Sequence, residues 1–101
     1  MPPLRRVVLD VLKPHEPSLV EYARRAAALD GVDGATARLV ETDREVQTVL
    51  LAVEGSEVPL DRLEGTVTDL GGAVHSVDLA ACGERVVDAG TGTGSPSIPR
   101  E

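Results

Sequence analysis

The chain has 101 residues, of which 42% are hydrophobic and 27% charged, and its 17 acidic against 10 basic side chains give a formal net charge of −7. This length and composition fit one small globular domain. The acidic balance excludes a nucleic-acid backbone or an anionic membrane as the expected partner, since both attract clustered Lys and Arg. No apolar stretch approaches the roughly 20 residues of a membrane-spanning helix. With Cys82 as the single cysteine, and Pro2 and Pro3 where a secretory signal would be apolar, we expect a cytoplasmic protein.

The first half of the chain predicts a strand followed by a helix. Residues 5–12 are rich in Val and Leu and almost continuously apolar, which is typical of a central strand. The segment 13–17 contains two prolines and ends that strand. A helix is predicted to begin at Ser18, because Ser18 and Glu21 have the spacing of a capping box. Gly31 is expected to end this helix.

The second half predicts two further strands, a second helix and a last strand. The strands 34–42 and 46–54 are joined by a short polar connection, which indicates a hairpin. The second helix is predicted over 59–70. Its apolar stripe at helical spacing comprises Leu60, Leu63, Val67 and Leu70. A strand over 73–81 follows, and the Gly-, Ser- and Thr-rich segment 89–101 is expected to be a disordered tail.

This order of elements is that of a ferredoxin-like βαββαβ sandwich, an α+β fold, which we predict as a single domain over 1–88. Right-handed crossovers would place both helices on one face of a four-stranded antiparallel sheet, with the spatial order four-one-three-two. The opposite face of the sheet, called the uncovered face below, has no helix on it. The apolar residues expected there are Val8, Leu12, Leu50 and Val74. Another subunit is expected to close such a face in so small a domain.

Two segments have a more distinctive amino-acid sequence than the rest of the chain. They are 9–18, which reads LDVLKPHEPS, and 69–78, which reads DLGGAVHSVD; a weaker third segment is 29–34. These segments resemble an archaeal family known as domain of unknown function 211, and the similarity covers about residues 4 to 88. The resemblance implies a ferredoxin-like fold that assembles into cytoplasmic homo-oligomers in the form of rings. It also implies bound divalent cations such as calcium, with the biochemical role unassigned.

Asp10 is the most informative polar residue, because burying an unpaired carboxylate in an apolar strand is costly. Strand alternation predicts that Asp10, Ser76 and Asp78 share the uncovered face. The same alternation places residues 75, 77 and 79 on the helix side. Two neighbouring carboxylates repel each other unless a positive charge separates them. A hard divalent cation held by oxygen ligands is one solution, and a salt bridge to Arg38 or to a neighbouring subunit is the other.

The two histidines form a second candidate set. His15 follows the first strand and His75 begins the last, so antiparallel pairing is expected to bring them to one edge of the sheet, beside Glu16. A His–His–carboxylate set can hold a transition metal, and a hydrogen-bonded structural role is the alternative. The predicted metal ligands are therefore Asp10, Asp78, His15 and His75. The sequence predicts no catalytic and no cofactor-binding residue.

These features favour a non-catalytic homo-oligomeric module that binds a divalent cation, with calcium first, or a small ligand. A regulatory domain that resembles amino-acid-sensing domains is an alternative, which Gly71, Gly72 and the uncovered face would permit. A small hydrolase of the acylphosphatase kind would need an asparagine, and the chain has none. Cys82 has only Arg85 as a basic neighbour in sequence, so we expect a small buried apolar group and no reactive thiolate.

Overall fold

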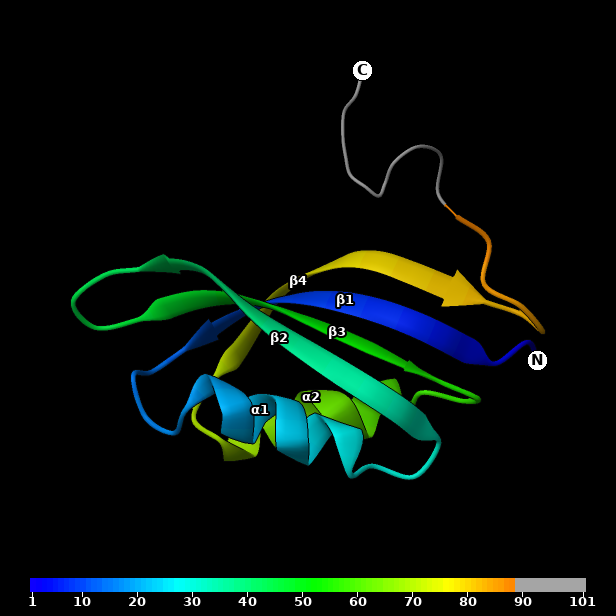
Figure 1. Ribbon diagram of the computed structural model, residues 1–101, viewed down its shortest axis with the longest axis horizontal. Coiled ribbons are helices and arrows are strands. Elements are labelled where there is room, and N and C mark those ends of the chain that lie inside the picture. Colours follow the sequence, from blue (N-terminus) through cyan, green and yellow to red (C-terminus); the bar gives the residue numbers. More distant parts are fainter. Residues whose placement is uncertain (89–101) are drawn as a thin grey trace, which may run out of the picture.

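A computed structural model describes residues 1–88 and has the predicted order of strands and helices. The elements are β1 (Leu4–Lys13), α1 (Leu19–Ala27), β2 (Val32–Thr42), β3 (Gln47–Gly55), α2 (Leu60–Asp69) and β4 (Ala73–Cys82). The strands form an antiparallel sheet in the order β2-β3-β1-β4, which is the predicted order counted from the other edge. Both helices lie on one side of this sheet (Figure 1). The ferredoxin-like α+β fold is therefore confirmed, while the tail predicted over 89–101 lies outside the described residues.

Local signals explain where α1 begins and ends. The Ser18 hydroxyl accepts a hydrogen bond from the Glu21 backbone N–H at 3.2 Å, as the capping motif predicts. The helix ends at Ala27, earlier than expected, and Leu29 then turns inward to pack against the core. Gly31 follows with φ at +91°, and a Cβ there would meet the Glu57 carbonyl oxygen, so only glycine fits.

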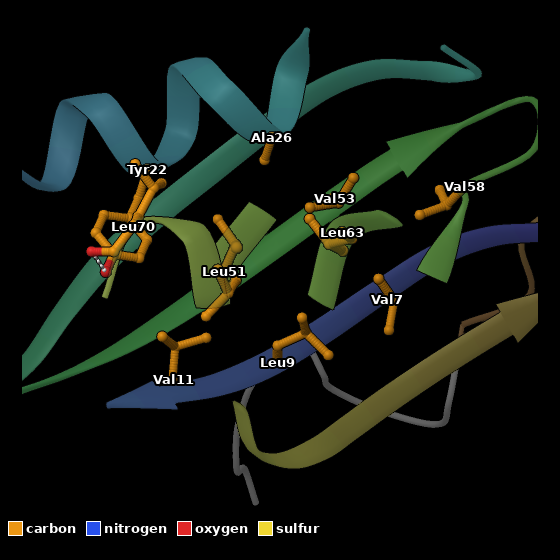
Figure 2. Close-up of a cluster of buried hydrophobic side chains, with 11 residues drawn as sticks. Val7, Leu9, Val11, Tyr22, Ala26, Leu51, Val53, Val58, Leu63 and Leu70 are labelled. Carbon is orange, nitrogen blue, oxygen red and sulfur yellow. Dashed lines mark hydrogen bonds between the residues drawn. The ribbon is translucent and has the colours of Figure 1, made fainter. Parts of the chain in front are cut away.

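The core lies between the sheet and the two helices, and Val and Leu supply most of it (Figure 2). Alternate residues of the two central strands point into it: Val7, Leu9 and Val11 from β1, and Leu51 and Val53 from β3. The helices contribute Tyr22, Ala26, Leu63 and Val67. Tyr22 is the one aromatic residue of the chain, and its hydroxyl donates a hydrogen bond to the Leu70 carbonyl oxygen at 2.9 Å. Neither α1 nor α2 has the length and hydropathy needed to cross a bilayer.

Candidate functional site

A row of four residues crosses the uncovered face from one edge of the sheet to the other. Arg38 of β2 lies opposite Leu50 of β3, and Leu50 lies opposite Asp10 of β1. On its other side, Asp10 lies opposite Ser76 of β4. Directly opposed residues in a sheet point to the same face, so Asp10 occupies the middle of the uncovered face, where the alternation predicts it.

The carboxylate of Asp10 lacks a partner inside the described part of the chain. Its Oδ1 atom is buried and makes no hydrogen bond with any of residues 1–88. The Ser76 hydroxyl is the nearest polar group in register, but it donates to Asp78 Oδ1 at 2.6 Å. Asp78 itself is exposed. Because a buried carboxylate oxygen without a partner is costly, this site calls for a donor or a cation from outside the described residues.

Two bulges in β4 bring Asp78 and His75 to their positions. The pairing of β1 with β4 shifts register three times, and two of these shifts skip a residue of β4, which is Asp78 in one case and His75 in the other. Each extra residue resets the alternation of side chains, which is why bulges often re-aim groups near functional sites. The expected alternation is therefore wrong for two residues. Leu79 lies opposite Val8 on the uncovered face, and Val74 packs against the core.

The two histidines contact different parts of the molecule. His15 Nε2 lies 2.9 Å from the Asp43 carbonyl oxygen, in the connection between β2 and β3. His75 belongs to β4, which pairs with the opposite side of β1 from β3. Within residues 1–88, no three His, Cys, Asp or Glu side chains are grouped so that they could hold one metal ion. The four predicted ligands thus do not form a single set within one copy, and their role in metal binding stays a prediction.

The alternative of a salt bridge between Asp10 and Arg38 is not formed within the chain. The two residues flank Leu50 in register, so two strand spacings of together roughly 10 Å separate their backbones. Among the described residues, the ion pair that does form joins Arg6 Nε to Glu54 Oε2 at 2.8 Å. It lies on the same face, where Arg6 and Glu54 are directly opposed.

Lys13 is a buried polar residue that sequence reasoning missed. It is the only lysine of the chain, and 1% of its surface is exposed. Its Nζ donates to the Pro14 carbonyl and to Gln47 Oε1, each at 2.8 Å, and lies 5.5 Å from the centre of the Tyr22 ring. A weaker bond of 3.4 Å reaches the His15 carbonyl. These contacts fix the segment after β1 against the start of β3.

The electrostatics of this cluster follow from burial. Burial holds the pKa of the Lys13 amine below its ordinary value of 10.5, because desolvation disfavours the charged form, and the nearby Glu16 carboxylate opposes this shift. Burial raises the pKa of the Tyr22 hydroxyl above 10.0 for the same reason. The sequence does contain a signal for Lys13. Every second residue of β1 points inward, and continuing this alternation along the strand places Lys13 on the inward side.

Cys82 corrects a further expectation. The thiol is free and the residue is exposed, whereas the sequence predicted a small buried group. Its position explains the difference, because β4 is an edge strand and Cys82 is its last residue.

The fold and this face define a ferredoxin-like α+β domain with two aspartates on the uncovered side of the sheet. The family model of DUF211, described as an uncharacterized ArCR, matches residues 5–93. The uncharacterized protein MJ0319 of Methanocaldococcus jannaschii is 34% identical over 85 residues, which cover 84% of this chain and 88% of that protein. The chain therefore belongs to the DUF211 family, as the segments around Asp10 and His75 predicted.

Proposed function

We propose that this chain is a non-catalytic cytoplasmic module that assembles with copies of itself through the uncovered face and binds a divalent cation there. The observation that carries the proposal is the buried Oδ1 atom of Asp10, which has no hydrogen-bond partner among the described residues. Calcium is the expected cation, because the ligands on offer are carboxylate and hydroxyl oxygens, which hard cations prefer.

The surroundings of Asp10 favour a protein surface as the cover. Val8, Leu12 and Leu50 lie around Asp10 on the uncovered face and are only partly buried, and both helices pack on the other side (Figure 1). Covering such side chains stabilises an assembly by about 25 cal/mol per Å² of apolar surface. At the β2 edge of the sheet, Val40 adds an exposed apolar side chain, of which 55% is accessible. A second copy of the chain offers apolar surface of the same kind.

The number of ligands also favours more than one copy. Calcium takes six to eight oxygen ligands, whereas one copy supplies the carboxylates of Asp10 and Asp78 and the hydroxyl of Ser76. A neighbouring copy and water would complete the shell, and the cation would relieve the repulsion between the carboxylates. His15 and His75 offer nitrogen ligands that suit a transition metal instead, so they enter this proposal as a separate prediction.

Calorimetric titration of the purified chain with calcium tests the site. We expect Asp10→Asn and Asp78→Asn each to weaken calcium binding at least tenfold, or about 1.4 kcal/mol. The matched control is Asp61→Asn, which removes a carboxylate from the first turn of α2 and should leave the affinity unchanged. Equal calcium affinity of Asp10→Asn and the unaltered chain would reject the carboxylate site. Parallel titrations with zinc of His15→Ala and His75→Ala test the histidine prediction on its own.

A further inference from the structure

A hollow on the uncovered face lies beyond the aspartate pair, at the other end of β1. Its volume is about 440 Å³, which lies within the range of small-molecule pockets. Residues of three strands line it: Arg6, Asp33, Gly34, Ala35, Thr36, Ala52, Val53 and Glu54. Neither Asp10 nor Asp78 belongs to this lining, so the proposed cation site does not use the hollow.

The hollow is shaped by small side chains among its lining residues, namely Gly34 and Thr36 on β2 and Ala52 on β3. Gly34 lies opposite Glu54, and Thr36 lies opposite Ala52 in the next outward-facing pair. A Cβ built on Gly34 meets no atom within 4 Å, so the missing side chain leaves open space. The φ angle of Gly34 is not positive, and the backbone therefore does not require a glycine here. A larger residue could be accommodated, and it would fill the hollow.

The walls of the hollow carry charges of both signs. Arg6 uses its Nε atom for the 2.8 Å ion pair with Glu54, and the side chains remain 40% and 53% exposed. No residue of the described part bonds the two terminal nitrogens of Arg6, which leaves a pair of donors suited to a carboxylate. A carboxylate-binding group and a carboxylate thus lie side by side on the hollow, a combination that matches a zwitterion.

Asp33 adds a second acidic group from β2. The pairing of β2 with β3 shifts register between Val32 and Gly34, so Asp33 is the extra residue of a bulge. Asp33 is exposed and forms no ion pair with another residue of the described range. Bulges re-aim side chains beside functional sites, and here the bulge lies directly on the hollow.

We propose that the hollow binds a free amino acid with a basic side chain. Its α-carboxylate would meet the terminal nitrogens of Arg6, its α-ammonium would meet Glu54, and its side-chain cation would meet Asp33. One guanidinium and two carboxylates leave the hollow with a charge of −1, which the +1 charge of lysine or arginine neutralises. An amino acid with an acidic side chain would bring a like charge to Asp33. This inference is independent of the proposed cation site.

NMR titration of the isotope-labelled full chain with L-lysine tests the inference, with L-glutamate as the ligand control. We expect lysine to shift the amide signals of residues 33–36 and 52–54, with glutamate binding at least tenfold more weakly. Gly34→Val fills the hollow and should weaken lysine binding at least tenfold, as should Arg6→Met. Arg38→Met is the matched control on the same face and should stay within twofold of the unaltered chain.

Two results would overturn the inference. One is the absence of shifts at these amides in about 10 mM lysine, because a site with millimolar affinity would be mostly occupied at that concentration. The other is unchanged lysine binding by Gly34→Val. This variant keeps the Arg6–Glu54 ion pair and the surface charge, so unchanged binding would show that lysine does not occupy the hollow. Asp10→Asn should bind lysine normally, which separates this site from the proposed cation site.

Discussion

Two glycines near α2 should respond to alanine in opposite directions. Gly65 lies inside α2, and a Cβ built there meets nothing within 4 Å, so Gly65→Ala should stabilise the protein by up to about 1 kcal/mol through helix propensity. At Gly72, a Cβ would lie 2.8 Å from the Tyr22 hydroxyl. The Leu12 carbonyl at 3.0 Å and a Val67 methyl at 3.2 Å close the remaining space. We expect Gly72→Ala to lower the free energy of unfolding by about 1–3 kcal/mol.

The Tyr22 hydroxyl should account for part of this cost. It is held in place by its hydrogen bond to the Leu70 carbonyl, so it cannot move aside freely. Tyr22→Phe leaves that buried carbonyl without its donor, which should cost about 1–3 kcal/mol, but it also makes room for the methyl group at position 72. Gly72→Ala should therefore cost at least about 0.5 kcal/mol less when it is combined with Tyr22→Phe than in the unaltered chain. The Leu12 carbonyl remains close and should keep part of the cost.

Urea unfolding followed by far-ultraviolet circular dichroism measures all four proteins of this cycle. Tyrosine fluorescence is unsuitable, because Tyr22 is the single aromatic residue of the chain and one variant removes it. The free energies come from linear extrapolation with similar slopes. Costs that add within about 0.3 kcal/mol would show that the hydroxyl and position 72 do not interact. A stabilising Gly72→Ala would refute the reasoning about the close approach altogether.

Three further predictions use the same unfolding assays. Ser18→Ala removes the hydroxyl that caps α1 and should lower the free energy of unfolding by about 1 kcal/mol, whereas an unchanged urea midpoint would contradict the cap. Leu63→Ala empties a fully buried position and should cost about 2–5 kcal/mol; a loss below about 1 kcal/mol would mean that the core closes over the gap. The pH profile has two parts with opposite signs. Because the folded-state pKa of Lys13 lies below 10.5, the unfolded chain binds more protons between the two values, and stability should rise with pH up to 10.5. Because the folded-state pKa of Tyr22 lies above 10.0, the folded chain binds more protons beyond that value, and stability should fall there. Lys13→Met should abolish the rise and Tyr22→Phe the fall, and unaltered profiles in both variants would disprove the assignment.

The periodicity of apolar residues in the sequence is enough to predict the fold, because the buried side of a helix or strand places apolar side chains at the period of that element. The stripe of α2 shows this directly, since Leu63 and Val67 lie four residues apart and both are buried. The cap at Ser18 is a local signal with a local cause, so it also holds. Gly31 has the expected positive φ, but it lies three residues beyond the C-cap Ala28, and the close approach that requires glycine there comes from the distant Glu57. The helix-end position is less well predicted, because Leu29 leaves the helix to reach the core.

The candidate site is predicted less completely, for reasons that lie beyond local pattern. Nothing in the sequence marks the bulges at His75 and Asp78, because an extra residue in one strand is defined only by its pairing with another. Alternation across such a bulge misplaces Val74 and Leu79. Lys13 was missed because a lysine at the end of a strand usually reaches solvent, whereas here Gln47 and two carbonyl groups supply its acceptors.

The central claim is that the uncovered face around Asp10 is closed by another copy together with a cation. Sedimentation of the full chain with calcium, and again with a chelator, tests it most directly. The account predicts an assembly of several 10.6 kDa chains in calcium and a shift toward smaller species in the chelator. A single 10.6 kDa species under both conditions would contradict the assembly. An assembly whose size is the same with calcium and with the chelator would contradict the role of the cation.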